Sequence, residues 1–386
     1  DYYASRGLGD VYKRQLQKRG TPTMGGVIIL LAILVPILLF GRLDNIYIQL
    51  MIVSTVWLGL IGGLDDYIKV FRHNKEGLKG RFKIVGQVGL GIIVGTTMWL
   101  SPQIIVREKV TQPVQTVYLN PDGSVIESVQ RNVVLSSEST KTTIPFVKNN
   151  EFDYGWLTGE DSATTWLLYV LVAIFVVTAV SNGANLTDGL DGLAVGVSAI
   201  STASLIVIAL MVKEVNIVII LCALFGACLG FIPYNMNPAK IFMGDTGSTF
   251  LGYILATLSI TGLFKMYAII SFAVPFLILG IPIFDISFAF LRRIAHGQNP
   301  MKADRGHFHH RLIDMGFSQK QAVAIAYMLT GILGLAAVLL TSSGELKALI
   351  LIAAIFIVSA IGFKLIFAKN DRSEDEPEEK QEEPHE

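Results

Sequence analysis

Long apolar runs alternate with short polar segments along most of this 386-residue chain. A membrane-spanning helix needs about 20 mostly apolar residues. This criterion predicts ten spans, at 23–40, 46–64, 82–100, 164–181, 190–212, 215–233, 249–264, 268–290, 322–340 and 346–367. Very short turns separate the fifth span from the sixth and the seventh from the eighth, so each pair is expected to form a helical hairpin. The expected fold class is an all-α polytopic membrane protein.

The amino-acid composition supports this class. Hydrophobic residues make up 52% of the chain and the mean hydropathy is +0.55. Charged residues make up 16%, compared with about 25% in soluble proteins. The formal net charge is zero, so charge indicates no nucleic-acid partner. Cys222 and Cys228 share one apolar run without metal-ligand spacing, and both are expected to be core residues.

Positive charges predict the orientation of the chain in the membrane. Segments 65–83 and 291–321 are rich in Lys and Arg, as cytoplasmic loops are. Threading ten spans with both segments inside places the remaining polar motifs on the cytoplasmic face as well, at 18–23, 182–189 and 234–248. Segment 101–163 then falls outside. Its alternating polar and apolar residues predict a small β-rich extracytoplasmic insertion.

The two ends of the chain differ from the membrane part. Residues 1–17 are polar and patternless, so we expect an atypical N-terminal segment with the first membrane span missing. Three spans are expected within 18–100, and seven spans with the active-site loops within 164–367. Residues 368–386 are acidic and contain proline, which is typical of a disordered tail.

Two acids stand between apolar runs in the stretch 181–193, SNGANLTDGLDGL. Asp188 and Asp191 are three residues apart among glycines, and Asn185 precedes them. Acids between two membrane spans are costly unless they face water and serve a function. Two interpretations stay open. The stretch is a ligand site, or it is a helix N-terminus with Asp188 as its cap and Asp191 in the first turn.

A second pair of acids ends the second predicted span. Asp65 and Asp66 are adjacent, so a cation or a basic neighbour such as Lys69 must hold them ionised. The alternative is a solvated helix end. Asp245 stands between glycines just before a later span, which is typical of a phosphate or metal loop at a helix start.

Weaker candidates accompany these acids. Phe242 lies close to Asp245 and is placed to stack on a base, although a lone Phe beside a span is more often an interfacial anchor. Asn235 is a further polar candidate in the same loop. Lys18 and Thr23 flank the start of the first predicted span, where basic residues also follow the positive-inside rule.

A cationic loop follows the eighth predicted span. It holds His307, His309 and His310 together with Arg305. Three close histidines suggest zinc, but cationic neighbours repel a metal and attract phosphate, so a phosphate-binding surface is favoured. A structural histidine cluster is the remaining alternative. Asp285, near the inner end of the eighth span, is expected to be structural.

Acids, histidines and cations thus gather on one membrane face. Divalent metal ions that bridge phosphates to carboxylates are a common use of such a set. The residues themselves therefore predict phosphoryl chemistry on a partly lipidic substrate. A secondary transporter is the alternative from another class, but its acids would be expected near the membrane midplane. A binding-only sensor would need no paired acids.

Five motifs resemble the polyprenyl-phosphate N-acetylhexosamine-1-phosphate transferase superfamily: TPTMGG, GGLDDYIKV, SNGANLTDGLDGLA, IFMGDTGS and ADRGHFHHRL. The resemblance implies a Mg²⁺-dependent enzyme of the bacterial inner (cytoplasmic) membrane with its active site on the cytoplasmic face. Such an enzyme transfers sugar 1-phosphate from a UDP-N-acetylhexosamine donor to undecaprenyl phosphate and releases UMP. A homodimer in the lipid bilayer is also expected.

The resemblance also implies residue roles. Asp65 and Asp66 are expected to be catalytic on the side of the lipid phosphate, and Asp245 is the expected Mg²⁺ ligand. Asp188 and Asp191 are expected to be catalytic contacts on the nucleotide and metal side. The expected substrate-binding residues are Lys18, Thr23, Lys69, Asn185, Asn235, Phe242, Arg305, His307, His309 and His310.

The two halves of the chain resemble different branches of this superfamily. The first half resembles the phospho-N-acetylmuramoyl-pentapeptide branch and the second half the GlcNAc-1-phosphate branch, with a change near 202–214 that suggests a hybrid chain. The histidine loop lies in the second half and is expected to contact the sugar. UDP-GlcNAc is therefore the expected donor, and UDP-MurNAc-pentapeptide is the alternative.

Overall fold

The computed structural model describes twelve stretches of the chain: 20–72, 77–101, 110–119, 125–135, 141–142, 152–153, 162–211, 213, 215–258, 277–295, 297 and 307–343. The N-terminal segment 1–17, the tail 368–386 and the predicted last span 346–367 lie outside these residues. So do Lys18 and Arg305.

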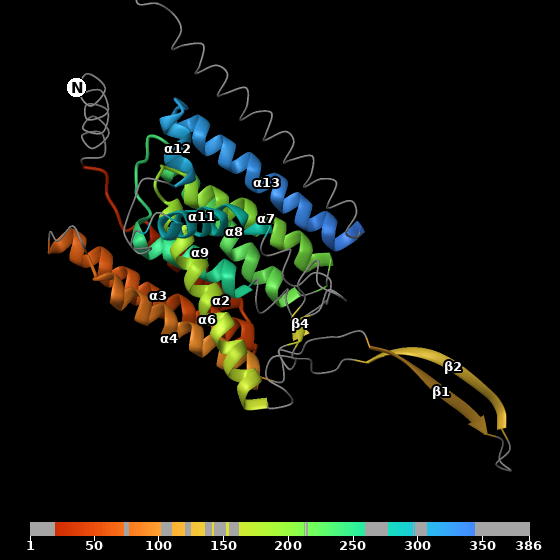
Figure 1. The fold of residues 1–386 in the computed structure, drawn as a ribbon. Helices are drawn as coiled ribbons and strands as arrows, with labels where there is room; N and C mark the ends of the chain where they lie inside the picture. The colour runs from red at the N-terminus through yellow and green to blue at the C-terminus, as the bar shows by residue number, and fades with distance from the viewer. Residues whose placement is uncertain are drawn as a thin grey trace, which may run out of the picture.

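Helices dominate the described residues (Figure 1). They are α2 (Gly26–Phe40), α3 (Ile46–Phe71), α4 (Gly80–Leu100), α6 (Ser162–Thr187), α7 (Leu193–Met211), α8 (Val215–Asn235), α9 (Gly244–Leu258), α11 (Gly280–Ala295), α12 (Phe308–Asp314) and α13 (Gln319–Ser343). Lipid offers no hydrogen bonds to a bare backbone, so apolar runs of this length fold as helices.

Five helices are long and apolar enough to cross a membrane: α3, α6, α7, α8 and α13. The chain is therefore a multi-pass membrane protein. The predicted number of ten spans is not confirmed, because the last span and the residues 259–276 lie outside the described part.

Several helices extend beyond the apolar runs that predicted them. Helix α3 continues to Phe71 rather than ending at residue 64, and α6 continues to Thr187 rather than 181. Helix α9 begins at Gly244 rather than 249. Hydropathy detects only the part of a helix that suits lipid, whereas tertiary contacts stabilise these polar ends. The acidic motifs consequently lie on or beside helix termini.

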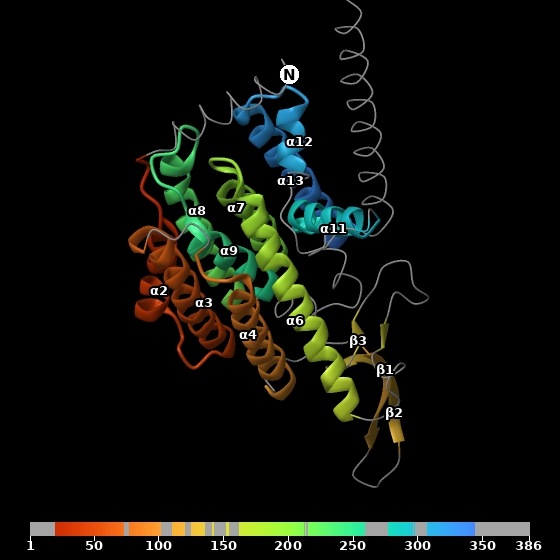
Figure 2. The same cartoon turned by 60° about the vertical axis from the view of Figure 1, so that its left-hand side comes forward.

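Segment 101–163 contains the described strands. Strand β1 (Val110–Leu119) pairs antiparallel with β2 (Val125–Leu135), and β3 (Lys141–Thr142) with β4 (Phe152–Asp153). Figures 1 and 2 show the β1–β2 hairpin at the end of the helical bundle opposite α12. Its location outside the cell membrane stays a prediction.

Other helices enclose helix α9. It contacts α2, α3, α6 and α7, and nearly all of its residues after Asp245 are buried. Glycines permit the close approach: a Cβ on Gly62 of α3 would lie 2.5 Å from Thr246 Cα, and a Cβ on Gly26 of α2 would overlap the Gly247 backbone. Packing at this depth fixes where the α9 N-terminus lies.

Two adjacent glycines test this packing. We expect Gly62→Ala to lower the stability of the protein by about 1–3 kcal/mol, because the new methyl group would overlap backbone that cannot yield. Gly63→Ala is the matched control, since a Cβ there meets nothing within 4 Å and Ala favours helix. Thermal unfolding in detergent measures both variants. Equal midpoints for the two would contradict this description of the α3–α9 contact.

Candidate active site

The α9 N-terminus is joined to α3 by one buried carboxylate. Asp66 Oδ1 accepts from Asp245 N at 3.3 Å, and Asp66 Oδ2 accepts from Thr246 N at 3.2 Å and Thr246 Oγ1 at 2.5 Å. Only 2% of Asp66 is exposed. The free N–H groups and the positive end of the helix dipole favour an anion here. Asp66 thus caps α9 from another helix.

Asp65 is buried one residue earlier and is surrounded by donors. Its Oδ1 accepts from Leu78 N at 2.6 Å and lies 3.0 Å from Lys83 Nζ. Lys69, one turn further along α3, places its Nζ 2.7 Å from Asp65 Oδ2. A carboxylate this deeply buried needs such cations to remain charged.

The same two lysines also contact Asp245. Lys69 Nζ lies 3.0 Å from its Oδ1 and Lys83 Nζ lies 2.5 Å from its Oδ2. Burial alone would raise the pKa of Asp245, but the two ammonium groups outweigh it and lower that pKa to about 2. The carboxylate is therefore ionised at neutral pH, and part of it remains open to solvent.

Magnesium fits this acidic cluster. One oxygen from each of Asp65, Asp66 and Asp245 lies within 4.8 Å of the others. Mg²⁺ prefers oxygen ligands and usually takes one or two carboxylates together with substrate phosphates. Among the described residues, Asp65 Oδ2 accepts no directed hydrogen bond, although Lys69 lies beside it. Counted formally, three carboxylates and two ammonium groups carry one negative charge, which a divalent cation would reverse.

In the sequence, Lys83 is recognisable only as one of the charges that mark a cytoplasmic loop. The structure places it between Asp65 and Asp245, as closely as Lys69. The sequence does hint at this role, because Lys83 lies in the first turn of α4, just after the loop that connects α4 to the helix of Lys69. No pattern within one helix shows that the two lysines converge.

The stretch 181–193 forms a helix end, a turn and a helix start. Asn185 lies in the last turn of α6 and accepts from Ser248 Oγ of α9 at 2.8 Å. Asp188 follows the end of α6, and α7 begins only at Leu193. The alternative that placed Asp188 at a cap and Asp191 in the first turn of a helix is therefore wrong.

The turn after α6 is tied to the loop between α8 and α9. Asp191 Oδ2 accepts from Asn237 Nδ2 at 3.1 Å and from Ala239 N at 3.3 Å. Asn235 Oδ1 accepts from Gly192 N at 3.1 Å, while Asn235 Nδ2 donates to Ile241 O at 3.0 Å. Asn235 thus uses both ends of its amide within the fold, and its binding of substrate stays a prediction.

Phe242 is held by its backbone against the start of α2. Its N–H donates to Pro22 O at 2.8 Å, and its C=O accepts from Gly25 N at 2.9 Å. These bonds place exposed Thr23 beside Phe242. The proposed stacking of the Phe242 ring on a base remains a prediction, as does binding by Thr23.

The histidine cluster is anchored by Asp285 of α11. Asp285 Oδ1 accepts from Phe308 N at 2.7 Å, and its Oδ2 lies 3.1 Å from His307 Nδ1. Asp285 therefore caps α12 and orients His307, which agrees with its expected structural role. The next ring, that of His309, lies 6.1 Å from the His307 ring and 4.3 Å from the His310 ring, centre to centre.

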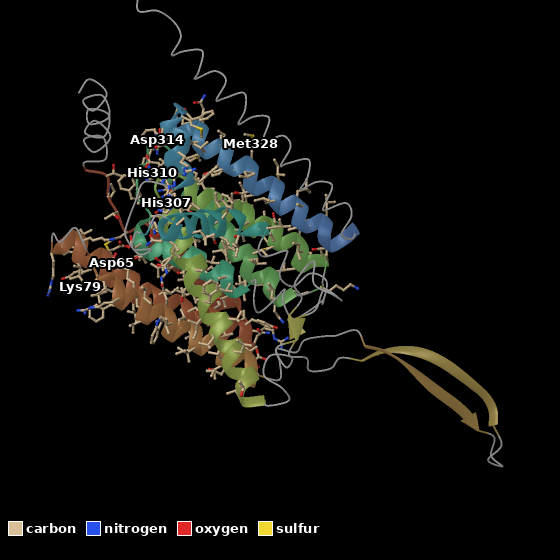
Figure 3. All side chains as sticks on the ribbon, in the orientation of Figure 1. Asp65, Lys79, His307, His310, Asp314 and Met328 are labelled. Carbon is tan, nitrogen blue, oxygen red and sulfur yellow. The ribbon has the colours of Figure 1, made fainter. Side chains whose placement is uncertain are left out.

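His309 brings this cluster onto the turn after α6. Its Nε2 occupies the space that a side chain on Gly189 would fill. Burial, assisted by nearby His310, lowers the pKa of His309 to about 4, so the ring is neutral at pH 7. Figure 3 shows His307 and His310 at the same end of the bundle as Asp65. The histidine cluster thus contacts the turn after α6 and lies at the same end of the bundle as the acidic cluster.

Comparisons with known proteins agree with these motifs. Residues 48–263 match Glycosyl transferase family 4, and residues 18–30 match Phospho-N-acetylmuramoyl-pentapeptide-transferase signature 1. Proteins named phospho-N-acetylmuramoyl-pentapeptide-transferase are similar to the chain. The one from Parabacteroides distasonis is 50% identical over 265 residues, which cover 64% of this chain and 61% of the relative. The one from Phocaeicola vulgatus is 49% identical over 264 residues, covering 64% and 60%.

A further relative of the same name, from Flavobacterium psychrophilum, is 48% identical over 265 residues, covering 64% of this chain and 63% of its own. The chain thus spans less than two thirds of the length of these relatives. Their names do not support the expected preference for UDP-GlcNAc. That expectation rested on a sugar contact by the histidine loop. The part of this loop that the structure describes packs on Asp285 and Gly189, and Arg305 lies outside the described residues. The match to the family covers more than half of the chain, and the chain therefore belongs to glycosyl transferase family 4.

Proposed function

We propose that this chain transfers phospho-N-acetylmuramoyl-pentapeptide from its UDP donor to undecaprenyl phosphate and releases UMP. A phosphate oxygen of the lipid forms a bond to the sugar-linked phosphorus, and the bond between that phosphorus and UMP breaks. The observation that supports this most strongly is the convergence of Asp65, Asp66 and Asp245 with two lysines at one end of the bundle. The names of the relatives support the choice of donor.

Charge is the main obstacle to this reaction, because both substrates are anions. Lys69 and Lys83 supply positive charge at the cluster, where low polarity strengthens their effect. Bound Mg²⁺ would supply further charge neutralisation for the phosphates. Asp245 is its proposed ligand, since its carboxylate is the most open of the three.

The two adjacent acids take different roles in this proposal. Both oxygens of Asp66 accept hydrogen bonds from the α9 N-terminus. We therefore propose that Asp66 positions Asp245 and does not itself bind substrate. Asp65 contacts Lys69 and Lys83, and it is proposed to take the side of the lipid phosphate. The Lys69 ammonium group contacts both Asp65 and Asp245, and it is proposed to bind a substrate phosphate near these two acids.

The donor would lie across the turn after α6. Phe242 is proposed to stack on the uracil, and Asn185 and Asp188 to contact the nucleotide. His309 packs against Gly189 of this turn, and the three histidines are proposed to contact the sugar or its phosphate. Lys18 and Arg305 keep their predicted roles in substrate binding.

We also propose that the protein lies in the bacterial inner membrane with this site on the cytoplasmic face. Lys and Arg around 65–83 support that orientation. The acids cluster at helix termini and not halfway along the helices, which disfavours the transporter alternative. A homodimer stays a prediction.

Release of UMP by the purified protein tests the proposed reaction. With Mg²⁺ and undecaprenyl phosphate present, we expect release from UDP-MurNAc-pentapeptide. UDP-GlcNAc is the control donor, from which we expect little release. Release from UDP-GlcNAc alone would contradict the proposed donor, and release from neither by folded protein would contradict the proposed activity.

Asp245→Asn tests the proposed metal ligand. We expect turnover to fall about 100-fold or more, because the site loses the charge that faces the metal. The thermal midpoint should change little, since Asp66 still caps α9 through backbone groups. Asp44→Asn is the matched control, as Asp44 pairs with Arg42 on the exposed connection at the far end of α3. Unchanged turnover in Asp245→Asn would remove this residue from the site.

A further inference from the structure

The backbone N–H and C=O of Gly192 are bonded to side chains of two different helices. Its N–H donates to Asn235 Oδ1 of α8 at 3.1 Å. Its C=O accepts from the Tyr327 hydroxyl of α13 at 2.6 Å and from Gly196 N at 3.0 Å. Gly192 itself has φ +83°, a conformation that favours glycine. The turn that precedes α7 therefore has a fixed orientation relative to α8 and α13.

Glycines shape the surface on which the Tyr327 ring rests. A Cβ on Gly196, one turn into α7, would overlap the ring at its hydroxyl end. A Cβ on Gly192 would lie 3.4 Å from the Tyr327 hydroxyl oxygen. The ring thus lies against the α7 backbone at Gly196. A side chain at position 196 would overlap the ring, so glycine there lets the hydroxyl reach the Gly192 carbonyl.

This contact bears on the loop that leads to the acidic cluster. Asp191, next to Gly192, holds Asn237 and Ala239 by its carboxylate. Asn235 holds Ile241, directly before Phe242. A shift of the Gly192 peptide would therefore move both attachments of this loop. Asp65, in contrast, is fixed by Leu78 and the lysines of α3 and α4, which do not depend on the turn.

We propose that Tyr327 is a positioning residue for the nucleotide side of the site. Its hydroxyl holds the Gly192 carbonyl, and through the turn it sets the loop that carries Phe242. This inference rests on the proposed function, which places the uridine nucleotide against that loop. Tyr327 lies within a predicted apolar span, where an aromatic residue is expected to belong to the core, so its role cannot be predicted from the sequence.

Tyr327→Phe isolates the hydroxyl, because the ring and its contact with Gly196 remain. Thr330→Val is the matched control: Thr330 is buried one turn further along α13, and its hydroxyl bonds only to Ala326 O of its own helix in the described structure. Both variants lose one neutral hydrogen bond. Equilibrium binding of UMP to the purified full chain and initial rates with each substrate varied are measured for both.

We expect Tyr327→Phe to weaken UMP binding and raise the donor KM by about two- to tenfold, the range for loss of one neutral hydrogen bond. The KM for undecaprenyl phosphate should not change, and Thr330→Val should change neither. Equal effects on both substrates, or UMP binding as tight as in the unchanged protein, would overturn the inference. Absence of UMP binding by the unchanged protein would overturn it as well. Intact UMP binding without turnover would instead contradict the proposed function alone.

Discussion

The bond network between Asp66 and the start of α9 is the contact on which the rest of the site depends. Asp66 is buried at the end of a membrane-length helix, where an uncompensated carboxylate would be strongly destabilising. Three donors of α9 form hydrogen bonds to this carboxylate, and the carboxylate in turn caps the N-terminus of α9. Asp245 lies in the first turn of that helix. The same hydrogen bonds therefore determine where the most exposed acid of the cluster lies.

Two lysines balance most of the negative charge of the three acids. Lys69 and Lys83 come from α3 and α4, yet each contacts both Asp65 and Asp245. Three acids could not gather within 4.8 Å without such charges. The formal negative charge that remains suits a divalent cation, and such a cation together with the lysines would suit the two anionic substrates of the proposed reaction.

Much of this arrangement could be predicted from local patterns, and the rest could not. Hydropathy located the helices but ended α3 before Asp65, because the polar end of that helix is stabilised by α9 rather than by lipid. Motif spacing identified the acids at 65, 66 and 245. Lys83 and Tyr327 were missed because their partners lie far along the chain. No local pattern reports such contacts.

The proposed function depends on a divalent metal ion bound at Asp245, next to the acids of α3. Electron paramagnetic resonance with Mn²⁺ as the probe tests this metal binding directly on the purified protein. We predict one tightly bound Mn²⁺ per chain, its affinity strongly reduced in Asp245→Asn and its spectrum altered by added UMP. Tight binding that is the same in the unchanged protein and in Asp245→Asn would contradict metal binding at Asp245.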